Sequence, residues 1–170
     1  MRNRDLADPG YARRLERFAE IAAPDSPLSA IFAREAAHAP IAHEILAGAP
    51  TSQPAANMLL AAVQYLLLEG IVDELAAHYP SIAPAEVVAH GDPGKQFLAF
   101  CRKHRERLAD LVSRRGVQTN EVRRCVILVP AFARIAATPL ALIEVGASGG
   151  LNLCFDRYRY DFGGVATGPN

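Results

Sequence analysis

Apolar residues recur every three or four positions through most of the first 137 residues, which is the spacing of one face of a helix. Proline and glycine divide this part of the chain into segments, because proline is favoured at the start of a helix and glycine just after its end. Pro130 is expected to kink the last segment, which Thr119 would cap. The pattern predicts helices over residues 11–23, 27–38, 40–47, 54–69, 93–115 and 119–136.

The pattern changes after residue 138. Leu140 to Val145 form an apolar run that contains one carboxylate, Glu144, and is followed by a glycine turn, which is typical of a buried parallel strand. Residues 157–162 then alternate between polar and apolar, which predicts a second strand. We therefore expect a mainly α chain, with a helical N-terminal bundle over residues 1–137 and the first strands of a Rossmann-like α/β sheet over residues 138–170. Two strands form no stable buried sheet, so we expect the sheet to be incomplete and to favour self-association.

Composition narrows the class of protein. Of the 170 residues, 51% are apolar and 21% are charged, which indicates a packed core rather than disorder. The net charge of zero gives no general attraction to nucleic acid or to anionic membranes. The N-terminus has no apolar signal segment, and charges and prolines interrupt the longest apolar stretch, so we expect a cytoplasmic protein with no membrane span. Three cysteines in apolar surroundings indicate free thiols.

The segment LIEVGASGGLN at 142–152 is the main candidate for chemistry. It can be a purely structural turn, since glycine turns after strands are common. It can also be a cofactor loop with the pattern Glu144-x-Gly146-x-Ser148-x-Gly150, in which the glycines let the backbone approach the ligand. Glu144 would then bind a ligand ammonium through water, and Asp161 would take the ribose hydroxyls of S-adenosylmethionine.

Residues 146–150 also match the pattern G-x-S-x-G, the turn that presents a nucleophilic serine in many hydrolases. In those enzymes the catalytic histidine follows the serine, whereas all five histidines of this chain precede Ser148. The sequence therefore favours the cofactor loop over a serine hydrolase. A non-catalytic helical interaction module remains the alternative function.

A metal site is weakly indicated by the sequence. Cys101 and His104 stand three residues apart on a predicted helix, but no second pair has a comparable spacing. We interpret them as a core cysteine beside a half-buried histidine, and we expect no metal.

The segments FLAFCRKHRERL at 97–108, TNEVRR at 119–124 and IEVGASGGLNLCFDRYRYDFGG at 143–164 resemble a bacterial family of uncharacterised proteins, domain of unknown function 2332. The resemblance implies a fold similar to S-adenosylmethionine-dependent methyltransferases, with a helical region before the sheet. It also implies that this chain is the N-terminal half of a longer protein. The family pattern covers Glu144, Gly146, Ser148, Gly150 and Asn152 in the loop, and Arg157, Tyr158 and Asp161 after it. A polar cluster of Gln118, Asn120 and Glu121 serves either to cap a helix or to contact a ligand.

Overall fold

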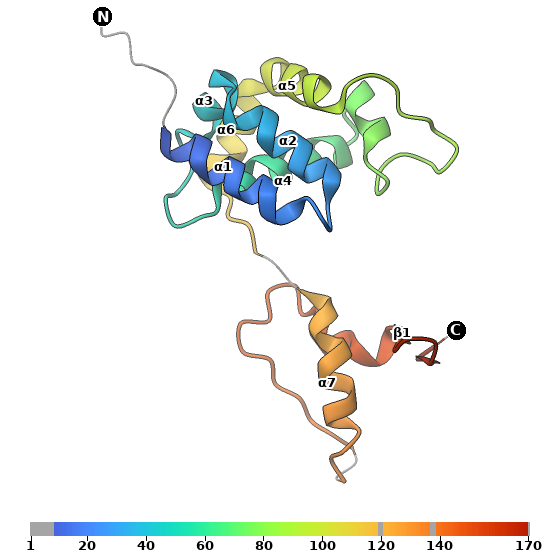
Figure 1. Cartoon of the computed structure of the whole chain (residues 1–170). Coiled ribbons are helices and arrows are strands. Elements are labelled where there is room, and N and C mark those ends of the chain that lie inside the picture. Colours follow the sequence, from blue (N-terminus) through green and yellow to red (C-terminus); the bar gives the residue numbers. More distant parts are fainter. Residues whose placement is uncertain (1–8, 119–120, 137–138, 170) are drawn as a thin grey trace, which may run out of the picture. The chain divides into compact units, whose positions relative to one another are not determined.

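The computed structural model describes residues 9–118, 121–136 and 139–169, and these residues form two compact units. The first, Met1–Val117, is called the helical unit, and the second, Gln118–Asn170, the C-terminal unit. Both units are drawn in Figure 1. The domain boundary predicted after residue 137 falls within the C-terminal unit, and it stays a prediction.

The helical unit is built from six α-helices and one 3₁₀ helix, as far as the chain is described. Proline is the first residue of four of the α-helices and directly precedes a fifth, which confirms that proline marks the helix starts. The elements are α1 (Pro9–Ala22), α2 (Pro27–Ala37), α3 (Pro40–Leu46), α4 (Ala55–Leu68), the 3₁₀ helix η1 (Glu74–His78), α5 (Pro93–Lys103) and α6 (Arg105–Arg114).

The helix predicted over 93–115 is two helices, and the expectation of one continuous helix was wrong. His104 separates α5 from α6 with φ −114° and ψ 22°, although its N–H still bonds the carbonyl of Phe100 at 2.9 Å. Its ring lies 4.4 Å from the ring of Phe100, centroid to centroid. Cys101 of α5 and Leu108 of α6 both lie in the core, where each is fully buried.

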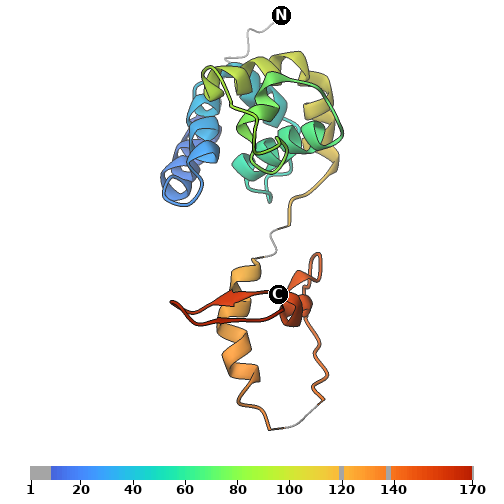
Figure 2. The ribbon, with the colours of Figure 1, turned by 90° about the vertical axis from the view of Figure 1, so that its right-hand side faces the viewer.

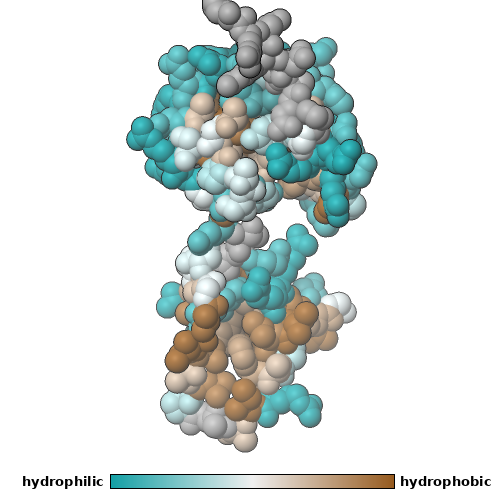
Figure 3. Space-filling view, turned by 90° about the vertical axis from the view of Figure 1, so that its left-hand side faces the viewer, coloured by the Kyte–Doolittle hydropathy of each residue, from teal (hydrophilic) through white to brown (hydrophobic). Residues whose placement is uncertain are grey.

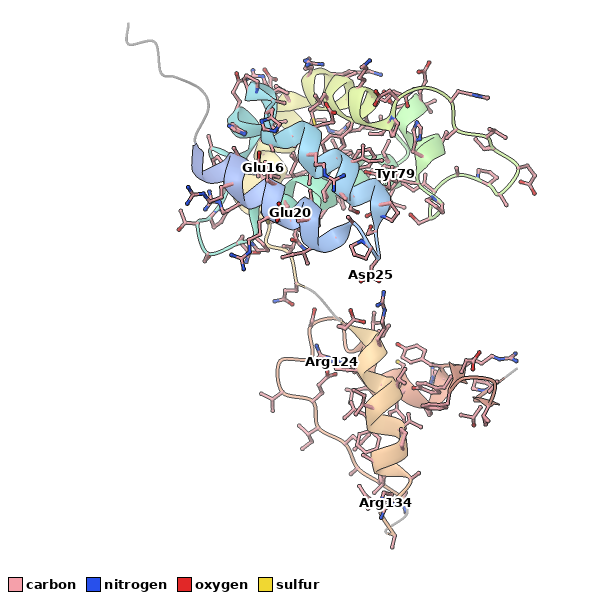
Figure 4. All side chains as sticks on the ribbon, viewed as in Figure 1. Glu16, Glu20, Asp25, Tyr79, Arg124 and Arg134 are labelled. Carbon is pink, nitrogen blue, oxygen red and sulfur yellow. The ribbon has the colours of Figure 1, made fainter. Side chains whose placement is uncertain are left out.

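The core of the protein lies in the helical unit. Phe32 of α2 stacks on Phe97 of α5 with centroids 4.5 Å apart, and Tyr79 packs against Phe32 at 5.7 Å. Tyr11 of α1 donates a hydrogen bond of 2.7 Å to the carbonyl of Leu46, which joins α1 to the end of α3. The side chain of Tyr79 lies among the helices, whereas Glu16, Glu20 and Asp25 mark the outer side of α1 and its turn into α2 (Figure 4).

The C-terminal unit has almost no core of its own. Its elements are the 3₁₀ helix η2 (Val122–Arg124), α7 (Cys125–Phe132), the 3₁₀ helix η3 (Leu151–Arg157) and the two-residue strands β1 (Tyr160–Asp161) and β2 (Ala166–Thr167). Among the described residues of this unit, only Cys125, Asn152 and Tyr160 are buried. Arg124 and Arg134 lie at the two ends of α7 (Figure 4). Pro130 lies inside this helix, which is shorter than the helix predicted over 119–136, and Thr119 lies outside the described residues.

The strand predicted at 140–145 is not formed. This segment runs back along α7 without belonging to a sheet (Figures 1 and 2). Ile143 and Val145 are 92% and 95% exposed, the opposite of a buried strand. A parallel strand is stable only between neighbouring strands that are covered on both faces. The described residues supply no such neighbour, because their only sheet is the pair β1–β2.

The second predicted strand is shorter than expected and lies in a hairpin. Tyr160 pairs with Thr167 and Asp161 with Ala166 in antiparallel register (Figure 2). Gly163 and Gly164 form the turn with φ +75° and +99°, the signs that a two-residue type I′ hairpin requires. This turn makes the next strand antiparallel, whereas the expected sheet called for a parallel one.

The described fold is therefore mainly helical, as predicted, with one small antiparallel hairpin in place of the start of a Rossmann-like sheet. Within the described parts of the chain, every helix is too short or too polar to cross a bilayer.

Candidate functional site

The predicted loop brings Glu144 and Asn152 together. The side-chain amide of Asn152 donates a hydrogen bond of 2.6 Å to Oε1 of Glu144. The second carboxylate oxygen, Oε2, is buried and has no hydrogen-bond partner among the described residues. A buried carboxylate oxygen without a donor costs free energy, so this atom is ready to accept a hydrogen bond from a ligand or from water.

The backbone between these two residues turns sharply. Gly146, Ser148 and Gly150 all have positive φ, at 74°, 51° and 69°. The N–H of Gly150 donates to the carbonyl of Ala147 at 2.8 Å, which closes the turn. A Cβ at Gly146 or Gly150 would meet nothing within 4 Å. Glycine is therefore needed at these positions for the backbone conformation, and the space beside each stays open.

Cys125, at the start of α7, completes the cluster. Its Sγ lies 3.6 Å from Oδ1 of Asn152 and 3.7 Å from the Asn152 carbonyl oxygen. Oδ1 of Asn152 accepts from the thiol, and Nδ2 donates to the carboxylate of Glu144. These two contacts determine the orientation of the amide. Cys125 was not among the site residues predicted from the sequence. It stands 27 residues from Asn152, and only its apolar surroundings indicated that it would be buried.

Asp161 is not joined to this cluster by any hydrogen bond or ion pair that the structure describes. Its Oδ1 accepts a 2.9 Å hydrogen bond from the N–H of Gly164, so the carboxylate stabilises the hairpin turn. Tyr158 lies nearer the loop, and its hydroxyl donates to the carbonyl of Leu151 at 2.6 Å. Burial raises the pKa of Tyr160, and Cys125 adds to the shift. The Tyr160 hydroxyl donates to the carbonyl of Phe155 at 2.6 Å, so both tyrosines donate hydrogen bonds to the backbone of η3.

The remaining residues that were candidates from the sequence make no hydrogen bond or ion pair with the cluster of Glu144, Asn152 and Cys125 that the structure describes. Ser148 is exposed, and its positive φ is strained for a residue with a Cβ. Glu121 caps η2 by accepting the N–H of Arg123 at 3.0 Å, which supports the capping interpretation of the polar cluster. Asn120 lies outside the described residues. Cys101 is buried and His104 half-buried, as predicted.

Comparison with known proteins gives one positive result. No curated protein and no solved structure matches the chain. The profile of the family described as "Uncharacterized protein conserved in bacteria (DUF2332)" matches residues 12–170, nearly the whole sequence and both units. The chain therefore belongs to this bacterial family, DUF2332.

Proposed function

We propose that residues 144–152 bind a small cofactor, S-adenosylmethionine, and that the protein is methyltransferase-like. The observation that carries the proposal is the carboxylate of Glu144. Asn152 holds one of its oxygens, and the other is buried without a donor among the described residues. A ligand ammonium group supplies the donor that this oxygen lacks.

Each loop residue makes a different contribution to cofactor binding. Glu144 accepts a hydrogen bond from the amino acid portion of the cofactor, and Asn152 positions the carboxylate. The open space beside Gly146 and Gly150 lets a ligand approach the backbone. Asp161 would take the ribose only if its free oxygen turned toward the loop, because Gly164 binds the other. When bound, the cofactor supplies an activated methyl group for a nucleophilic acceptor.

Calorimetry with S-adenosylmethionine and its demethylated product tests the proposal. The protein should bind both, and Glu144→Gln should weaken binding at least about tenfold, since it removes the charge that faces the ammonium. Asp156→Asn is the matched control, because it removes an exposed carboxylate from the same unit. Absence of binding at millimolar concentration, or equal losses in the two variants, would contradict the proposal.

A non-catalytic interaction module is the second candidate. The exposure of Ile143 and Val145 favours it, because large apolar side chains at a surface mark a contact with another protein segment. Apolar residues gather on the surface of the C-terminal unit (Figure 3). This candidate predicts association through residues 140–145 and no cofactor binding.

A serine hydrolase is the third candidate, favoured by the exposed and strained Ser148. Its weakness is that the C-terminal unit contains no histidine to act as a base. Labelling by a fluorophosphonate that Ser148→Ala abolishes would establish this candidate, and absence of labelling would exclude it.

A further inference from the structure

The helical unit contains a cavity that the loop proposal does not use. It has a volume of about 200 Å³ and lies between α4, α6 and the three residues that follow α6. Its lining is almost entirely apolar or small: Met58, Ala61, Ala62, Tyr65, Leu111, Val112, Arg115, Gly116 and Val117. An apolar cavity of roughly 150 Å³ is large enough to bind benzene, so this one can hold a ring or a short alkyl chain.

The wall formed by Gly116 and Val117 is fixed by a contact from far along the sequence. The N–H of Val117 donates a 3.1 Å hydrogen bond to Oε1 of Gln53. The amide nitrogen of Gln53 would lie 3.2 Å from a Cβ placed on Gly116, so the two segments are closely packed. Met58 and Val112, on the facing helices, are 3% and 1% exposed. The cavity is therefore bounded on one side by buried core residues, while Ala61 and Arg115 lie at its exposed edge.

Arg115 is the only charged residue among the described residues that line this cavity. Its guanidinium lies 4.5 Å from the centroid of the Tyr65 ring. Among the described residues, no carboxylate oxygen lies within 4.0 Å of it. The three carboxylates of the adjoining surface are paired elsewhere: Glu69 with Arg107 at 3.1 Å, Asp110 with Arg114 at 2.7 Å and Glu106 with Arg105 at 3.4 Å.

We propose that this cavity binds a small amphipathic carboxylate, with its apolar part between α4 and α6 and its carboxylate on Arg115. The apolar lining gains free energy by excluding water from the ligand body. The guanidinium fork matches a carboxylate in charge and in geometry, and the ring of Tyr65 helps to hold it in place. A ligand of this class fills the apolar space and also provides a carboxylate for Arg115. An amine would instead place a second positive charge beside Arg115. The proposal is independent of the glycine loop.

Methyl NMR of the whole protein provides a direct readout, because the chain has only two methionines, Met1 and Met58. Met58 lines the cavity, so titration with octanoate should shift its labelled methyl resonance in a saturable way. Octylamine, of the same chain length and opposite charge, should leave Met58 unshifted.

Three variants separate the contributions of charge and shape. Arg115→Gln should weaken octanoate about tenfold, the loss expected for one charge-assisted contact. Arg114→Gln, the neighbouring cation outside the cavity, should change nothing. Ala61→Phe fills the cavity from an exposed position and should abolish the Met58 shift while circular dichroism stays unchanged.

The proposal fails if Met58 does not respond to millimolar octanoate. It also fails if octanol or octylamine binds as tightly as octanoate, because the cavity would then recognise only apolar volume. Equal effects of Arg115→Gln and Arg114→Gln would overturn the role of Arg115.

Discussion

The amide of Asn152 and the carboxylate of Glu144 are joined by a 2.6 Å hydrogen bond that spans the whole glycine loop. Asn152 is 7% exposed and is one of the few buried residues of the C-terminal unit. The bond closes the loop around its left-handed residues, and it determines which carboxylate oxygen is left for a ligand.

Replacement of Asn152 by alanine should open the loop. Both oxygens of Glu144 would then lack a donor, a loss that typically costs about 1–3 kcal/mol of stability for a buried polar group. The amides of Gly150 and Leu153, which bond within the loop, should exchange with deuterium faster than in the parent protein. Leu151→Ala removes an exposed neighbour and should leave their exchange unchanged. Unaltered exchange in Asn152→Ala would show that the bond does not hold the loop.

Substitutions at the left-handed positions should have opposite effects. Gly146→Val forces a β-branched residue to φ +74° and should cost about 1–3 kcal/mol, although no atom stands in its way. Ser148→Gly relieves strain at φ +51° and should stabilise the loop by up to about 1 kcal/mol. Chemical denaturation measures both changes. A destabilising effect of Ser148→Gly would mean that the hydroxyl makes a contact that outweighs the strain.

The apolar surface at 140–145 should make the protein self-associate or bind a hydrophobic dye. Ile143→Lys combined with Val145→Lys should reduce association and dye fluorescence, because these side chains are 92% and 95% exposed. Ile21→Lys alters an apolar residue of the helical unit that is 68% exposed, and it should change little. Sedimentation velocity provides the measurement. A monomer that binds no dye would contradict the prediction.

The three thiols should react with iodoacetamide in a defined order. Burial raises the pKa of Cys101 to about 12, and Arg102 offsets only part of this rise. Little reactive thiolate therefore exists at neutral pH. Cys154 is half-buried and should be modified first, whereas Cys101 and Cys125 should react only on unfolding. Peptide mass spectrometry gives the order, and early modification of Cys101 would show that the core around α5 opens.

Acidic pH should destabilise the helical unit through His104. Loss of solvation lowers the pKa of this histidine, as do Lys103 and Arg107, while Asp73 acts in the opposite direction. The unfolded chain takes up a proton near its ordinary pKa of about 6.5, and the folded chain does so only at lower pH. Stability is therefore retained above about pH 6.5 and declines as the pH falls below it.

Two variants test the role of His104. His104→Gln should reduce the loss of stability at low pH, and His38→Gln is the matched control. His38 is exposed beside Glu16 at 3.3 Å and should leave the His104-dependent decline in place. Denaturation at several pH values gives the comparison. A decline of the same size in His104→Gln would assign the pH dependence to other groups.

The helices of the first unit could be predicted from the sequence because proline and glycine act locally. A proline at residue 27, 40 or 93 fits the first turn of a helix whatever surrounds it. The bend at His104 could not be predicted, since residues 93–115 keep one helical pattern throughout. Cys101 and Leu108 would also share one face of a straight helix, so the apolar pattern does not distinguish one helix from two.

The C-terminal unit was harder to predict because strands depend on partners. An apolar run such as 140–145 indicates burial, but pairing decides whether it becomes a strand. The pair Gly163-Gly164 did carry a local hairpin signal, which the alternation at 157–162 obscured. In the candidate site, Glu144 and Asn152 were both predicted as members. Their contact, and the approach of Cys125, depend on tertiary structure.

The hydrogen bond from Val117 to Gln53 also decides where mechanical load enters the helical unit. Val117 is the last residue of that unit, so a force that pulls on the chain beyond it would act directly on this contact. The bond joins the chain after α6 to the loop before α4, 64 residues away in the sequence, so a force applied at Val117 would be shared between these two segments. Gln53 therefore gives the end of the helical unit a second attachment to that unit, in addition to the peptide chain itself.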